Sequence, residues 1–205
     1  MLYSVLEHKE MNMDAKEMEA KIKSLEEKVQ TLEDKEQIKI VQKSYGYYMD
    51  NLMYDDAADL FTDDCHAFHI QGRENLKASF NTFTTPRFEG TKKLFLKQQL
   101  MGVIHVDKGN KTAKGRWNML CLKTDYVGDE LESIISHGVY ECEYRKEDGI
   151  WKISNLVFNS SFQTTLKDGW AKKPVIYPKN PGDVAKTWAS GYKMPLHYKN
   201  PVTGK

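Results

Sequence analysis

Apolar residues recur at helical spacing near the start of the chain. Met18, Ile22, Leu25, Val29 and Leu32 are separated alternately by four and three residues, and Glu and Lys fill the positions between them. This is a short heptad pattern, which predicts a helix whose seam packs on another subunit or on the rest of the chain. We predict a charged amphipathic helix within residues 1–33.

A second helical pattern follows and ends at an acid. Ile38, Val41, Tyr45, Tyr48 and Leu52 recur at spacings of three and four, which predicts one apolar helix face. Asp34 is a possible cap at its start, and Asp50 lies where the helix meets the body of the domain. Asp50 is either a solvated residue at a helix end or a functional acid in an apolar setting.

The remainder of residues 34–165 alternates between strand and turn signals. We predict a short strand over 65–70 and a helix from Glu74 to about Thr84, stopped by Thr84-Thr85-Pro86. Further strands are predicted over 92–106, 112–126, 133–145 and 150–162. Three helices followed by a meander predict an α+β fold with a curved antiparallel sheet wrapped on the helices.

The last part, residues 166–205, is rich in Pro, Gly, Lys and aromatic residues. Such a composition does not form a core by itself, yet its aromatic residues argue against a free tail. We predict an extended C-terminal arm that lies across the sheet or reaches a neighbouring subunit.

Composition excludes several classes of protein. The 205 residues include 30 Lys and Arg against 29 Asp and Glu, so the chain lacks the basic field typical of nucleic-acid binding. It has no apolar run of about 18 residues and no apolar leader, so we expect neither a membrane span nor a secretory signal and predict a cytoplasmic protein. Nucleophile-elbow, P-loop and dinucleotide-binding motifs are missing from the sequence.

Metal binding is also not expected. Three cysteines, Cys65, Cys121 and Cys142, are odd in number and widely spaced, which favours reduced, buried thiols over a disulfide framework or a zinc site. His66 and His69, three residues apart on a predicted strand, point to opposite faces and cannot share an ion.

Several short motifs occur in a recognisable order. They are Asp59-Leu-Phe-Thr-Asp-Asp64, Gln71-Gly-Arg-Glu-Asn-Leu-Lys77, Gly115-Arg-Trp117, and Gly138-Val-Tyr140 leading to Tyr144-Arg-Lys-Glu-Asp-Gly-Ile-Trp-Lys-Ile153. With this set, residues 35–160 resemble the SnoaL-like branch of the NTF2-like superfamily, which includes dehydratases of the bile-acid 7-alpha and scytalone type. The resemblance implies a cone-shaped fold around an apolar pocket with a polar site.

The resemblance also implies a set of catalytic residues. SnoaL-like dehydratases, isomerases and cyclases use an Asp at the end of the first helix, a nearby Tyr and one or two His on the sheet. Asp50 and Tyr45 match the first two, whereas the family's strand His would fall at Lys97 or Gln98. His137 is the best replacement as proton carrier, although a strand-end His is as often structural. An apolar pocket moves the pKa values of its acids and bases toward neutrality, so no cofactor or metal is expected.

Other residues are expected to bind substrate. Lys97 and Gln98 point to opposite faces of a strand, so at most one looks inward, where Lys97 would act as a base or Gln98 as a hydrogen-bond donor. Trp117 and Tyr140 are expected in the pocket wall or the core, and His69 at the cavity.

These patterns favour one function over two others. The resemblance implies a cofactor-independent lyase or isomerase, dehydratase-like, acting on a small hydrophobic cyclic substrate. The alternatives are a non-catalytic ligand-binding module and an assembly module of the same fold. The family resemblance and the two appendages predict a homo-oligomer, a dimer or a trimer.

Overall fold

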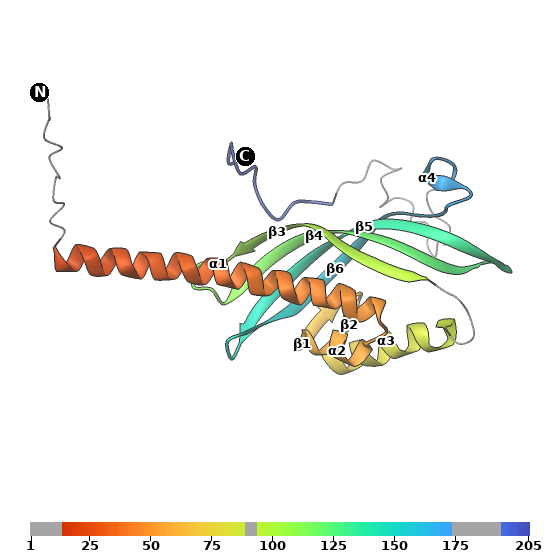
Figure 1. Ribbon diagram of the computed structural model, residues 1–205, viewed down its shortest axis with the longest axis horizontal. Coiled ribbons are helices and arrows are strands. Elements are labelled where there is room, and N and C mark those ends of the chain that lie inside the picture. Colours follow the sequence, from red (N-terminus) through yellow and green to blue (C-terminus); the bar gives the residue numbers. More distant parts are fainter. Residues whose placement is uncertain (1–13, 89–93, 174–193) are drawn as a thin grey trace, which may run out of the picture.

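The computed structural model describes residues 14–88, 94–173 and 194–205 and contains, within these ranges, four helices and one six-stranded sheet (Figure 1). The elements are α1 Ala15–Asp50, α2 Tyr54–Asp59, β1 Phe61–Ala67, β2 Ile70–Gln71, α3 Arg73–Phe88, β3 Phe95–Val106, β4 Thr112–Val127, β5 Glu130–Glu147, β6 Ile150–Thr165 and α4 Gly169–Lys172. Figure 1 shows α2 and α3 on one side of the sheet and the C-terminal segment on the other.

The strands follow the order β2-β1-β6-β5-β4-β3, with β3 and β2 at the two edges. Neighbours are antiparallel except β1 and β6, which run parallel. The predicted α+β fold with a curved sheet on three helices is therefore confirmed, apart from that one parallel pair. Long strands with alternating burial, such as β4 and β5, form its centre.

Several predicted boundaries differ from the structure by a few residues, and two of these differences have a clear physical cause. The strand expected over 65–70 is β1, which ends at Ala67, because Phe68 and His69 have φ of 52° and 70° and turn the chain into β2. The helix expected to stop near Thr84 runs to Phe88. A proline in a last helical turn removes only one backbone donor, which the helix tolerates there.

Helix α1 is one continuous helix across residue 34, so Asp34 is not a cap. Asp34 is fully buried and accepts hydrogen bonds from Lys146 Nζ (2.6 Å), Trp151 Nε1 (2.9 Å) and Gln30 Nε2 (3.2 Å). Burial favours its neutral form, but these donors outweigh that effect and lower the pKa of Asp34. The carboxylate thereby joins α1 to the β5–β6 hairpin.

The core beneath α1 contains a chain of polar side chains. Trp117 Nε1 donates to Tyr144 Oη (2.9 Å), Tyr144 Oη donates to Gln42 Oε1 (2.7 Å), and Gln42 Nε2 donates to Gln99 Oε1 (3.0 Å). Gln42, Trp117 and Tyr144 are buried, so each partner satisfies a group that would otherwise be costly to desolvate. The chain fixes α1 over the middle of β3, β4 and β5.

Edge strand β3 contains a bulge. Its register with β4 shifts between Leu100 and Val103, where Met101 has a φ of 52°. A Cβ built on Gly102 would lie 2.2 Å from the ring of Trp117, so only glycine fits at this position.

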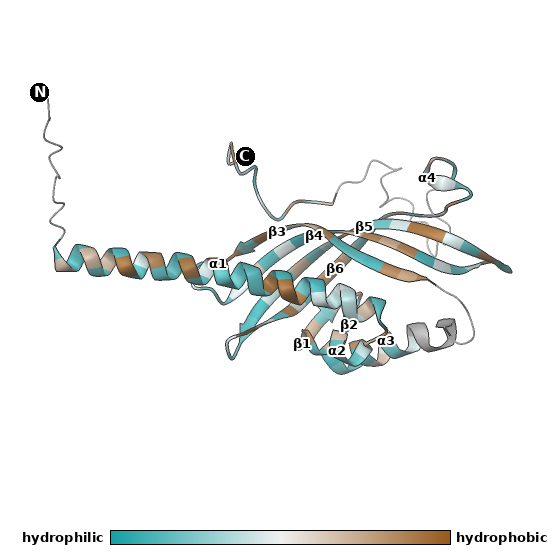
Figure 2. Cartoon of the chain, viewed as in Figure 1, coloured by the Kyte–Doolittle hydropathy of each residue, from teal (hydrophilic) through white to brown (hydrophobic). Residues whose placement is uncertain are grey.

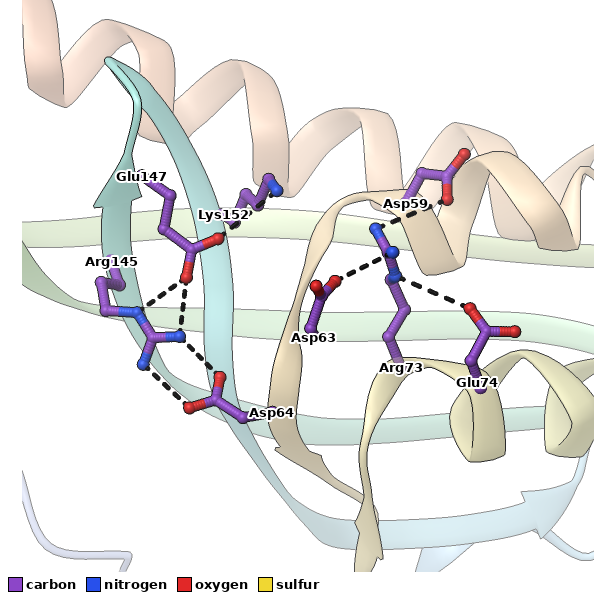
Figure 3. Close-up of polar contacts among 8 residues, drawn as sticks. All are labelled: Asp59, Asp63, Asp64, Arg73, Glu74, Arg145, Glu147 and Lys152. Atoms are coloured by element: carbon purple, nitrogen blue, oxygen red, sulfur yellow. Dashed lines mark hydrogen bonds and ion pairs between the residues drawn. The ribbon is translucent and has the colours of Figure 1, made fainter.

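Two arginines connect β1 to α3 and to β5 at the surface (Figure 3). Arg73 of α3 lies 2.9 Å from Asp63, and Arg145 of β5 lies 2.5 Å from Asp64 and 2.7 Å from Glu147. Water screens exposed pairs of this kind, so each contributes little to stability.

The end of the C-terminal arm lies on the outer surface of the sheet. Arg116 Nη1 donates to Pro195 O (2.9 Å), and His197 Nδ1 lies 2.8 Å from Glu141 Oε2. The prediction that the arm crosses the sheet surface holds for these residues, whereas 174–193 lie outside the described residues. No helix in the described ranges is both long and apolar enough to cross a membrane.

Replacing Asp34 by Asn should destabilise the fold by about 1–3 kcal/mol at neutral pH, because the ammonium of Lys146 and the indole of Trp151 lose a buried anionic acceptor. The folded-state pKa of Asp34 is lowered, so its contribution is complete above the ordinary value of 3.8 and is lost as the pH falls through the folded value. The free energies of unfolding of wild type and variant, measured with urea, should therefore become equal at acidic pH. Asp64→Asn, at an exposed pair, is the matched control; an equal loss in both variants would contradict the prediction.

Candidate functional site

A cavity of about 320 Å³ lies between the helices and the inner face of the sheet. Its wall is mostly apolar, and a few polar side chains enter it from the strands. It is lined by Tyr45, Met49, Phe68, Ile70, Ser79, Phe80, Phe95, Lys97, Met119, Cys121, Lys123, Thr124, Asp125, Ser136, Phe158, Ser160 and Gln163. This composition is typical of small-molecule sites.

Strand register decides which candidate residues enter the cavity. Lys97, Cys121, Ser136 and Gln163 are consecutive cross-strand partners, and all four line the cavity. The adjacent row is Gln98, Leu120, His137 and Phe162. Successive side chains alternate between the faces of a sheet, so this second row lies on the outer face.

Lys97 and His137 were the candidate bases from the sequence, and of these two Lys97 lines the cavity. Its Nζ lies 5.2 Å from the centre of the Phe95 ring, within cation–π range. Burial lowers the pKa of Lys97, and the charge of Lys123 lowers it further, while Cys121 and Asp50 oppose the shift. A lysine in this setting has an increased fraction of neutral amine.

A second lysine in the cavity is paired with an acid. Lys123 Nζ lies 3.0 Å from Asp125 Oδ2, with side chains only 14% and 15% exposed. Sequence reasoning did not identify this pair. The available signal was the spacing of two residues, which places opposite charges on one strand face.

Asp50 contacts the backbone of Lys97. Its Oδ1 accepts a hydrogen bond from the backbone N–H of Lys97 (2.5 Å), and burial raises the pKa of Asp50 against the effect of that bond. Asp50 lines a groove between α1 and β3, not the main cavity. Gly46 permits this close approach, because a Cβ there would lie 3.2 Å from Lys97 O and 3.1 Å from Gln99 Cγ.

Tyr45 lies in the wall of the cavity, one and a half helical turns before Asp50. It is fully buried and makes edge contacts with the rings of Phe61 and Tyr140 at 5.8 and 6.3 Å. Burial raises the pKa of Tyr45 well above its usual range, so its hydroxyl keeps its proton.

His137 does not meet Asp50 in the cavity, contrary to the sequence expectation. Its ring stacks on Phe162 at 6.0 Å with an interplanar angle of 19°, on the outer face, and burial there lowers its pKa. His137 and Tyr140 are three residues apart, so one strand cannot direct both to the same face. Tyr140 is the inward residue, 1% exposed.

The remaining candidates lie outside the cavity. Gln98 is exposed and lines only the groove beside Asp50, and His69 is exposed in the β1–β2 turn. Trp117 and Tyr140 are buried in the core and do not line the cavity. Among the side chains that the structure describes, no group of three His, Cys, Asp or Glu is arranged to hold a metal ion.

Comparison with known families gives a clear assignment. A family profile described as "SnoaL-like domain" matches residues 30–157. The chain belongs to the SnoaL-like domain family, as its motifs predicted. A search of curated protein sequences gave no match.

Solved structures show the same fold. A hexachlorocyclohexane dehydrochlorinase (LinA type 3) from Novosphingobium barchaimii LL02 is 22% identical, with a TM-score of 0.58, over 68% of this chain and 94% of that one. A candidate scytalone dehydratase from Novosphingobium aromaticivorans is 22% identical, with a TM-score of 0.58, over 67% of this chain and 90% of that one. At this identity the likeness establishes the fold.

Asp50→Asn should lower the pKa of Lys97 further, because the charge of Asp50 favours the ammonium while the amide oxygen still accepts the backbone hydrogen bond. Carbon NMR of reductively methylated protein should follow this titration, with Lys97→Met identifying the signal. The same substitution at a remote exposed acid, Asp63→Asn, is the control. A Lys97 titration unchanged by Asp50→Asn would refute the coupling.

Proposed function

We propose that this protein is a cofactor-independent lyase or isomerase that acts on a small hydrophobic cyclic molecule by abstracting a carbon-bound proton. The observation that carries the proposal is the amine of Lys97 inside a mostly apolar cavity, next to a second, ion-paired lysine. The family membership of residues 30–157 and the names of the structural relatives, a dehydrochlorinase and a candidate dehydratase, support the same reaction class.

In the proposed reaction, Lys97 is the general base. Its neutral amine removes a proton from carbon and becomes an ammonium, and the electrons of the broken C–H bond form the new double bond. Asp50, bound to the backbone of Lys97, favours that ammonium through its charge. Lys97 thus has the role that the family resemblance assigns to a histidine.

Lys123 is placed to assist the leaving group. In an elimination, the bond to the leaving group breaks as the double bond forms, and the group departs with the electron pair as an anion. The ammonium of Lys123, held 3.0 Å from Asp125, offers positive charge to that anion inside the same cavity. If no group leaves, the electron pair of the broken C–H bond shifts into an adjacent unsaturated group of the substrate, and the Lys97 ammonium returns the proton at a different carbon. The outcome is then isomerisation.

The size and the lining of the cavity support the proposed substrate class. Its volume of about 320 Å³ is at the lower end of ligand pockets, which fits a compound of one or two rings. Phe68, Phe80, Phe95 and Phe158 supply apolar wall, while Ser136 and Gln163 offer hydrogen bonds to a ring substituent.

Lys97→Met should lower kcat by two orders of magnitude or more, roughly the contribution of a general base, with folding unchanged. Hexachlorocyclohexane and hydroxylated mono- and bicyclic compounds form the substrate panel, with loss of HCl or water measured by mass spectrometry. Lys108→Met, in the exposed β3–β4 turn, is the matched control. His137→Ala tests the alternative base. If it lowered kcat as much as Lys97→Met does, the proposed role of Lys97 would be overturned.

Turnover should rise with pH, because the base acts only when unprotonated, and the midpoint should follow the lowered pKa of Lys97. Asp50→Asn should shift this midpoint to lower pH. A flat profile would argue against Lys97 as base. Compounds from the panel that bind without any turnover would favour the alternative of a non-catalytic ligand-binding module.

A further inference from the structure

The N-terminal half of α1 carries an apolar seam that the described domain does not cover. The five seam residues are about half exposed: Met18 49%, Ile22 53%, Leu25 52%, Val29 53% and Leu32 62%. Figure 2 shows apolar residues recurring along the part of α1 that projects beyond the sheet. The sequence left two partners open for this seam, the rest of the chain or another subunit. The exposure of the seam shows that no described part of the same chain covers it.

The seam faces away from the domain. The side of α1 that packs against the sheet is marked by its buried residues, Asp34, Ile38, Gln42 and Tyr45. At 3.6 residues per turn, the seam lies about half a turn round the helix from these residues. A second chain can therefore approach the seam without meeting the domain of the first.

The seam residues favour a two-stranded coil. In heptad notation Ile22 and Val29 occupy a positions, and Met18, Leu25 and Leu32 occupy d positions. β-Branched residues at a with leucine at d favour parallel dimers over higher oligomers. Past Leu32, the next a and d positions are Glu36 and Lys39, paired at 2.5 Å on their own helix, so the apolar seam ends there.

The flanking charges determine the partner and its direction. Every e position is glutamate (Glu19, Glu26 and Glu33) and every g position is lysine (Lys21, Lys28 and Lys35). Parallel helices bring g opposite e, so Lys21 would face Glu26 of the partner subunit and Lys28 would face Glu33 of the partner subunit. An antiparallel pair would oppose lysine to lysine and glutamate to glutamate.

We propose that residues 15–33 form a parallel two-stranded coiled coil with the same segment of a second copy of this chain. The seam is only about two to three heptads long, which would be marginal for free peptides. Here the helix is already nucleated by its buried continuation over the sheet, so association does not bear the cost of forming it. The two domains lie on the outer sides of the coil. The proposal is independent of the catalytic one.

Sedimentation of the full chain at tens of micromolar should give twice the mass of 23.7 kDa. Leu25→Asp should give the single-chain mass, because it places a charge in the seam of each helix. Ser24→Asp adds the same acid one residue away, outside the seam, and should leave the dimer intact. Circular dichroism checks that both variants fold. A monomeric or trimeric wild type, or a dimer that survives Leu25→Asp, would overturn the proposal.

Cross-linking tests the direction of the two helices. A short bismaleimide should join Met18→Cys chains in high yield, since parallel helices bring identical d positions together, whereas the native cysteines are all buried. Ala20→Cys, on the far side of the helix, should cross-link weakly. Equal yields from both variants, or none from Met18→Cys, would show that the helices do not pair in parallel.

Discussion

Polar side chains spaced along helix α1, among them Asp34, Gln42 and Asp50, hold it on the sheet, and the rest of the structure depends on its position. Asp34 binds the β5–β6 hairpin, Gln42 joins the buried chain through Tyr144, and Asp50 binds the backbone of Lys97. If the helix slid along the sheet by one residue, these groups would lose their partners in a low-dielectric interior. The position of α1 therefore fixes the cavity wall and the direction in which residues 15–33 project.

The same anchoring sets the electrostatics of the cavity. Two cations in one apolar space repel each other unless an anion joins them or one gives up its proton. Asp125 directly pairs with Lys123, whereas Asp50 reaches Lys97 only through the backbone. The environments of the two lysines are thus unequal, and the proposed division of roles, proton transfer for Lys97 and charge stabilisation for Lys123, rests on this inequality.

Much of the fold follows from local sequence patterns, but the site depends on register. The long strands show an apolar period of two and the helices a period of three to four. Tyr45 lines the cavity, whereas Asp50 lines the groove between α1 and β3. Counting back by twos from buried Ile104 would direct Gln98 inward. The bulge at Met101 reverses that alternation and directs Lys97 inward instead. Single-sequence patterns do not locate such a bulge, although the outward position of His137 relative to Tyr140 was available from their spacing.

The bulged strand has a further consequence at the edge of the sheet. An edge strand presents unpaired amides that can recruit a strand from another molecule and begin aggregation. In β3, the backbone N–H of Lys97 already donates a hydrogen bond to the carboxylate of Asp50. The bulge at Met101 also interrupts the regular extended backbone with which an incoming strand would pair. The opposite edge, β2, is only two residues long. The contact between Asp50 and the backbone of Lys97 therefore also makes β3 a poorer template for an added strand.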